Sequence, residues 1–268
     1  MKRIAAWLVA GARTLRTMQL PGGELPAVLW SDNGEAYAAP APLLSALAHD
    51  ALGFADPRAP HFIGRLRDLV PSSFFLDIVS LRWGLRLSLA NEAGADGTWQ
   101  RHGRLGARVT DIATTACAAA AMLPGVKWRR ERADPRPRAA LQRIAPSDRP
   151  NAWSTLEAAH ALRYFALLGG DTASLLARVR DDARHPPSDT ATRHAIASAL
   201  RVCGERAGFE TTAAASTEGP LDDALRTATR LDAGDDGSPQ LDDALARILR
   251  DDTPPSRWAA DPYGNTRL

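Results

Sequence analysis

The chain has 268 residues, of which 45% are hydrophobic and 24% are charged. At ~100–200 residues per domain, this length allows one large domain or two small ones, and the near-average composition excludes disorder throughout. The 33 Lys and Arg residues against 31 Asp and Glu residues give a net charge of +2. The whole chain therefore offers no electrostatic case for binding nucleic acid.

The first predicted element is a helix over residues 4–18. Lys2-Arg3 before an apolar run, with the small residues Ala10-Gly11-Ala12, also has the pattern of a cleaved secretory signal. The apolar face, however, continues at helical spacing past Arg13 and Arg16 to Met18. This periodicity favours a helix of the mature protein over a cleaved signal.

Other strongly periodic segments are also predicted to be helices, because Gly and Pro stand at their ends and apolar residues recur every three to four positions. They are residues 43–52, 74–90, 111–123, 153–168, 189–207, 221–231 and 241–249. Alternation of Val, Ile and Thr of the kind found in strands is nearly absent. The sequence therefore predicts an all-α fold, and no segment approaches the ~20 apolar residues of a membrane span.

Two connections stand out between these helices. Residues 127–138 are rich in Arg and Pro and contain Trp128; they could grip a diphosphate, an anionic lipid or RNA, or form a solvated charged loop. Residues 211–219 are small and polar, which is typical of a flexible joint. Helical hairpins of similar size lie on both sides of each, so we expect a single domain over residues 1–268.

The two cysteines, Cys117 and Cys203, lie in alanine-rich stretches. A secreted disulfide scaffold would contain more cysteine, so the sequence favours a reducing, cytoplasmic location. No spacing of Cys and His is typical of a zinc site, and we expect no bound metal.

Two stretches of the chain repeat each other. A glycine turn at Gly23 precedes a helix expected to start near Tyr37, and a glycine turn at Gly97 precedes the helix starting at Asp111. Both separations are 14 positions. Each unit is predicted to be an αα-hairpin that must pack on its neighbours to bury its apolar faces.

The second unit resembles a known repeat. Asp96-Gly97-Thr98-Trp99 followed by Asp111-Ile112-Ala113-Thr114-Thr115-Ala116 resembles the repeat of squalene and oxidosqualene cyclases and of protein prenyltransferase β-subunits, with weaker echoes at residues 153–156, 188–192 and 236–238. The resemblance implies an α/α toroid with a central cavity lined from the N-termini of the inner helices. Since nearer five hairpins than six are present, an open crescent is the other arrangement.

The resemblance implies an enzyme that acts on an isoprenoid, with Asp111 catalytic and near the reacting group. Residues expected to line its cavity are Tyr37, His102, Thr114, Trp153 and Asp189. Ala113 stands where the protonating cyclases have their acid, the paired aspartates from Asp222 onward lack the third acid of a magnesium motif, and no prenyltransferase zinc ligands match. We therefore expect no cofactor, unless a diphosphate substrate brings magnesium. The alternative is a non-catalytic module that binds a hydrophobic ligand, a protein partner or another copy of itself.

Each candidate residue also has a structural interpretation. Asp111 and Asp189 begin helices, where carboxylates commonly cap the first turn. His102 fits a general acid or base near neutral pH, or a solvated loop histidine. Tryptophans are candidate pocket walls, whereas the one in the glycine turn is expected to pack between repeats; the five are Trp83, Trp99, Trp128, Trp153 and Trp258.

Overall fold

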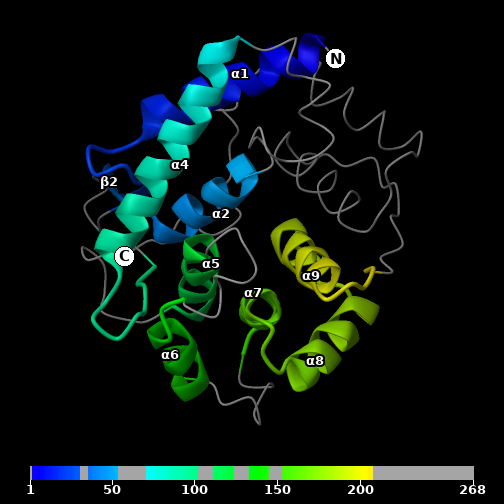
Figure 1. Cartoon of the computed structure of the whole chain (residues 1–268). Helices are drawn as coiled ribbons and strands as arrows, with labels where there is room; N and C mark the ends of the chain where they lie inside the picture. Colours follow the sequence, from blue (N-terminus) through cyan, green and yellow to red (C-terminus); the bar gives the residue numbers. More distant parts are fainter. Residues whose placement is uncertain are drawn as a thin grey trace. The chain divides into compact units, whose positions relative to one another are not determined.

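The computed structural model describes residues 2–30, 36–53, 71–101, 111–123, 133–144 and 153–207 of the chain (Figure 1). The chain divides into two compact units, the first ending at Gly125 and the second beginning at Val126. The described residues form eight helices and one two-stranded sheet. The predicted helical class is therefore confirmed, with a small sheet that the sequence did not indicate; the toroid or crescent arrangement stays a prediction.

The first unit contains four described helices and the sheet. In chain order the elements are α1 (Lys2–Met18), β1 (Pro26–Trp30), β2 (Ala36–Pro40), α2 (Pro42–Gly53), α4 (Ser72–Glu92) and α5 (Ile112–Met122). α2 packs against both α4 and α5, and α1 packs against α4 (Figure 1). The helix predicted over residues 4–18 is confirmed, and its Ala12 is buried in the core beside α4.

The short sheet corrects one prediction. β1 and β2 pair antiparallel, and Tyr37 lies opposite Leu29 in this register. The helix expected to start near Tyr37 begins instead at Pro42. A residue that precedes proline is pushed toward extended conformations, so Pro40 and Pro42 keep the chain extended until the first helical position, where proline is well tolerated.

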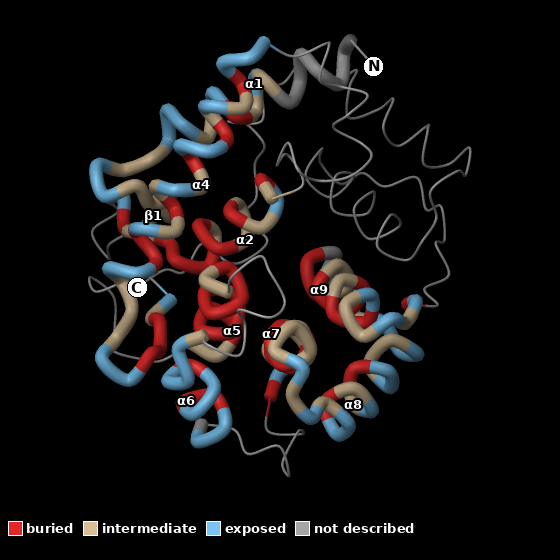
Figure 2. The backbone as a smooth tube through the Cα atoms, in the orientation of Figure 1, coloured by how far each residue is buried: buried red, intermediate tan, exposed pale blue. Residues whose placement is uncertain are grey.

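α4 and α5 differ in how they are buried. α4 carries one apolar face into the core, formed by Phe74, Ile78, Leu81, Leu85 and Leu89. α5 is buried along nearly its whole length, from Ala113 to Ala121 (Figure 2). Its side chains are almost all alanine, threonine or cysteine, and small side chains let neighbouring helices approach closely.

The second unit contains α6 (Arg136–Ile144), α7 (Thr155–Leu168), α8 (Ala173–Arg184) and α9 (Thr190–Val202). α7 packs against α8 and α9. Its start is fixed by a capping box between Ser154 and Glu157, and its end by Gly169 in the left-handed conformation at φ 74°. Buried large side chains form the core of this unit: Leu162, Tyr164, Leu175, Val179, Ile196 and Leu200.

Three predictions for this unit were incomplete or wrong. α6 and α8 were not predicted, and α6 includes residues 136–138 of the stretch predicted to be a loop. The helix expected over residues 189–207 ends at Val202, because Gly204 takes up φ 80° and donates its N–H to the Arg201 carbonyl. Residues 127–132, the joint at 211–219 and the helices at 221–231 and 241–249 lie outside the described residues.

Candidate functional site

The glycine turn before α5 is built by its own side chains. The carboxylate of Asp96 accepts hydrogen bonds from the backbone N–H of Thr98 at 3.2 Å and from its hydroxyl at 2.8 Å. Gly97 has φ 79° and donates its N–H to Gly94, whose own N–H donates to the Thr98 carbonyl. Asp96, Gly97 and Thr98, three of the residues that carry the resemblance, are therefore used to close this turn.

Trp99 fastens the turn to two helices. Its indole Nε1 donates to the Leu89 carbonyl of α4 at 2.8 Å, and its backbone N–H donates to the Thr115 hydroxyl of α5 at 3.1 Å. The same hydroxyl lies 3.3 Å from the Trp99 carbonyl, to which it donates. Trp99 is buried, so its expected packing role is confirmed, but both helices that it joins belong to its own repeat.

The turn before α2 has the same backbone hydrogen bonds. The N–H of Leu20 donates to the Glu24 carbonyl at 2.9 Å, and the N–H of Gly23 donates to the Leu20 carbonyl at 2.8 Å. Gly23 has φ 91°. Because Gly94 and Gly97 make the same two bonds in the second turn, the internal repeat is confirmed at the level of the backbone.

The match continues into the following helices. The N–H of Leu25 donates to the Ser45 hydroxyl at 3.0 Å, as that of Trp99 does to Thr115. The N–H of Ala41 donates to the Leu25 carbonyl, as that of Asp111 does to Trp99. Ala41, and not Tyr37, is therefore the counterpart of Asp111, since four additional residues separate turn and helix in the first copy.

Asp111 caps the N-terminus of α5. Its Oδ1 accepts the N–H of Thr114 at 2.6 Å, and its Oδ2 accepts from Nε of Arg101 at 3.1 Å. The guanidinium also forms an ion pair with Oδ2, and the Asp111 side chain is 11% exposed. Both carboxylate oxygens are thus engaged in structural bonds, one to a backbone N–H and one to a guanidinium.

Thr114 lies beside Asp111 on the first turn of α5. Its side chain is fully buried, and its hydroxyl oxygen has no hydrogen-bond partner among the described residues. The structure therefore brings the predicted catalytic residue and one predicted cavity residue together; the first is charged and bonded, and the second is buried and has no bond among the described residues.

Trp153 and Asp189 lie in the second unit. Trp153 is buried just before α7, and its indole N–H has no partner among the described residues. Asp189 caps α9 by accepting the N–H of Thr192 at 2.7 Å. Tyr37 lies in β2, and His102 lies outside the described residues.

No group of metal-ligating side chains is found in the part of the chain that the structure describes. Among the helices described, none has the length and apolar character needed to cross a bilayer.

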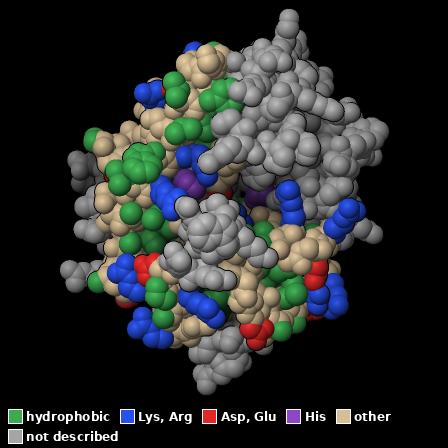
Figure 3. Space-filling model, in the orientation of Figure 1, with side chains coloured by type: hydrophobic (Ala, Val, Ile, Leu, Met, Phe, Trp, Pro, Cys, Tyr) green, Lys and Arg blue, Asp and Glu red, His purple; other side chains and the backbone are tan. Residues whose placement is uncertain are grey.

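The described surface holds an apolar strip that the sequence analysis missed. Large side chains on α4 are exposed on the face opposite the core: Leu76 (73%), Val79 (56%), Trp83 (68%) and Leu87 (49%). In Figure 3, hydrophobic side chains follow the course of α4. We call Leu76, Val79, Trp83 and Leu87, together with Ala90, the α4 strip.

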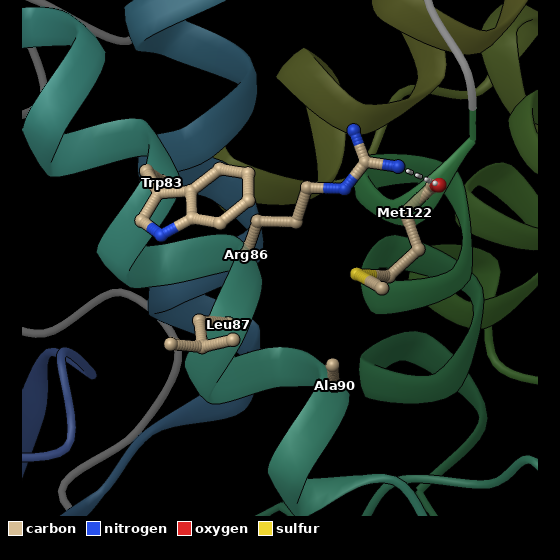
Figure 4. Close-up of a pocket in the computed structure, with 5 residues that line it drawn as sticks. All are labelled: Trp83, Arg86, Leu87, Ala90 and Met122. Carbon is tan, nitrogen blue, oxygen red and sulfur yellow. Dashed lines mark hydrogen bonds between the residues drawn. The ribbon is translucent and has the colours of Figure 1, made fainter.

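A pocket lies where the α4 strip meets the end of α5. Trp83, Arg86, Leu87 and Ala90 reach it from α4, and Met122 closes it from α5 (Figure 4). Arg86 donates from Nη2 to the Met122 carbonyl at 3.0 Å, which joins the two helices at the rim. The cavity has a volume of ≈ 160 Å³, and its lining is almost wholly apolar.

The signal for the α4 strip was present in the sequence. Leu76, Val79, Trp83 and Leu87 are separated by three, four and four positions, which is the spacing of one helix face. The opposite, buried face of the same helix is also apolar. The prediction considered that face alone and placed the whole helix in the core. Trp83 was among the tryptophans considered as pocket walls, and it does line a pocket.

Comparison with known proteins adds no relative: no family model, no curated protein and no solved structure matches this chain.

Proposed function

We propose that this protein is a helical-hairpin repeat module that binds a protein partner through the α4 strip. The observation that supports the proposal is the character of the exposed positions of α4. They are Ser72, Ser73, Leu76, Val79, Ser80, Trp83, Leu87, Ala90 and Asn91, and none carries a charge. A soluble surface typically has ~25–35% charged residues, so nine uncharged positions with four large apolar side chains are typical of a docking face.

The pocket beside the strip fits a side chain better than a separate ligand. Small-molecule sites usually enclose about 300–1,000 Å³, whereas this pocket has ≈ 160 Å³. An isoprenoid chain would exceed it, but a single leucine or methionine of a partner would fill it. A pocket that receives one apolar anchor of the partner is a common arrangement in protein interfaces.

A photo-crosslinking experiment tests this function. A benzophenone amino acid at position 79 is expected to form an adduct with a partner in cells that express the protein, and Leu87→Glu in the same chain should abolish it. The matched control carries the benzophenone at Ala177, an exposed position of α8 in the second unit. Equal adducts from positions 79 and 177, or an adduct that survives Leu87→Glu, would contradict the proposal.

Isoprenoid chemistry is the second candidate. Its support is the repeated turn geometry at the openings of α2 and α5, together with the buried, unbonded Thr114 hydroxyl beside Asp111. Against it, the oxygens of Asp111 already bond to Thr114 and Arg101. Incubation with farnesyl diphosphate, geranylgeranyl diphosphate and squalene, with and without magnesium, tests it; product that persists in Asp111→Asn would remove Asp111 as the acid.

A further inference from the structure

The partner of the α4 strip is, we propose, a second copy of this chain, seated antiparallel along the same helix about a two-fold axis. The inference rests on the proposed function, because it names the occupant of the same face. Three features of α4 support it: the charges around the strip, the order of large and small side chains along it, and the position of the pocket relative to Leu76.

Two charged side chains beside the strip, Asp77 and Arg86, already bond within the chain. Asp77 forms an ion pair with Arg16 of α1, and Arg86 donates to the Met122 carbonyl. A partner recognised by charge would find no free group on the exposed positions of α4, all of which are neutral. The surface that matches a neutral apolar strip is another neutral apolar strip, and a second copy supplies one without like-charge repulsion.

The side chains along the strip are self-complementary when two helices run antiparallel. With the two-fold axis level with the peptide between Leu81 and Arg82, each residue faces the residue equally distant on the other side. Trp83 then faces Ser80 of the second copy, so the largest side chain of the strip meets a small one, as ridges meet grooves in packed helices. Leu76 faces Leu87, and these two leucines pack on each other.

In the same register, Leu76 of one copy lies at the pocket of the other copy. Leu76 and Leu87 are 11 residues apart, which is ~16 Å along a helix at 1.5 Å per residue. In the antiparallel pair, Leu76 of one copy lies at the height of Leu87 of the other, between the pocket residues Trp83 and Ala90. Leu76 is the most exposed of the large apolar residues described, and it is the anchor that this pocket would receive.

The area of the contact sets the affinity expected for the dimer. The strip runs from Leu76 to Ala90, ~21 Å along a helix about 10 Å wide, or roughly 200 Å² in plan for each copy. Stable interfaces bury about 800 Å² per partner. The dimer should therefore be reversible and in the micromolar range or weaker, because even interfaces of standard size reach only micromolar affinity when few anchors are present.

The first experiment measures self-association of the purified full chain by sedimentation equilibrium over a wide micromolar range. A reversible dimer is expected. Leu76→Glu and Leu87→Lys should each raise its dissociation constant by about tenfold or more, because the two-fold axis buries each unpaired charge twice. Ala177→Asp, which adds a charge to an exposed position of α8, should leave the dimer unchanged. Circular dichroism establishes that every variant is folded.

The second experiment tests the register. Mixing the Leu76→Glu and Leu87→Lys variants should restore association, because the mixed dimer pairs the introduced glutamate with the introduced lysine and keeps one native leucine pair. Parallel helices would bring position 76 to position 76 and give no rescue. Failure of rescue overturns the antiparallel arrangement, and a dimer that neither variant weakens overturns the site.

A monomer at every concentration would overturn the second copy as partner. If position 79 still forms its Leu87-dependent adduct with another protein, the proposed function stands and only the inference fails. If both the dimer and the adduct are absent, the proposed function fails with it. Isotopically labelled and unlabelled protein can also be mixed, so that crosslinks between copies are distinguished by mass. A benzophenone at position 76 of one copy that links to the peptide containing Met122 of the other copy would support the inference directly.

Discussion

The α-carbon of Gly23 lies against the backbone of Gly84 in α4. A Cβ placed on Gly23 would stand 2.7 Å from the Gly84 carbonyl oxygen, and Gly23 also has φ 91°. A Cβ placed on Gly84 would stand 3.2 Å from Nε2 of the flexible Gln19 side chain and 3.8 Å from the Gly23 α-carbon, the second being an ordinary van der Waals contact. The glycine turn therefore sits on α4 because one of these two residues has no side chain.

This asymmetry predicts different costs for two alanine substitutions. Gly23→Ala should lower the free energy of unfolding by about 2 kcal/mol or more, because it adds the strain of a positive φ to a backbone clash. Gly84→Ala should be neutral or stabilise by up to about 1 kcal/mol, since alanine is favoured over glycine inside a helix. Urea denaturation measures both. Equal losses for the two variants would contradict the proposed geometry.

Two adjacent threonines of α5 make a matched pair. The Thr115 hydroxyl bonds to the backbone of Trp99, whereas the buried Thr114 hydroxyl has no partner among the described residues. Thr115→Val should lower the free energy of unfolding by about 1–3 kcal/mol, because the N–H of Trp99 is left unbonded. Thr114→Val should leave the free energy of unfolding unchanged or raise it, since it removes a buried hydroxyl that has no hydrogen-bond partner among the described residues. Losses of the same size for both, measured by thermal or urea unfolding, would show that Thr114 makes a bond too.

Two substitutions of Asp111 distinguish the stability that comes from its helix cap from the stability that comes from its ion pair. Asp111→Ala should lower the free energy of unfolding by about 0.5–2 kcal/mol, because the N–H of Thr114 loses its acceptor. Asp111→Asn keeps an acceptor oxygen and should retain most of that stability. If Asp111→Asn is as damaging as Asp111→Ala in a denaturation experiment, the ion pair with Arg101 contributes more than the cap. Asp189→Ala, which removes the corresponding cap of α9, is the control in the second unit.

Because Tyr164 is buried, we expect the protein to lose stability at alkaline pH. Burial raises the pKa of Tyr164 to about 12 from an ordinary value of 10.0, and the negative charge of Asp134 contributes to the rise. The folded state holds the proton more tightly than the unfolded state, so this contribution is complete below pH 10 and is lost as the pH rises toward 12. The loss should reach at most about 2–3 kcal/mol. Unfolding measured across this range should show it, and Tyr164→Phe should remove that part of the pH dependence.

The helices that could be predicted from the sequence are those with both an apolar face and a clear end. α7 is the best case, because Ser154 and Glu157 mark its start and Gly169 its end. α6 and α8 escaped prediction because each is rich in arginine and buries few apolar side chains: Pro137, Ala140 and Leu141 in α6, Leu175 and Val179 in α8.

The candidate site was harder to predict than the fold. Asp111 was correctly recognised as the start of a helix, but its pairing with Arg101 depends on how the glycine turn folds back, which spacing alone does not give. The α4 strip escaped because periodicity shows that a face is apolar and cannot show which of two apolar faces remains uncovered. The packing of α1, α2 and α5 onto α4 distinguishes Leu81, which is buried, from Trp83, which is exposed.

The two glycine turns close the same bonds around connections of different length. Between Leu25 and Ala41 the first repeat accommodates the β1–β2 hairpin, whereas the second repeat joins Trp99 to Asp111 with four fewer residues. In both repeats the ends of this connection are joined by the same backbone bond between the turn and the start of the helix. These closing bonds accept connections of two lengths, so the connection is the part of the repeat whose length can vary while the turn and the helix start stay the same.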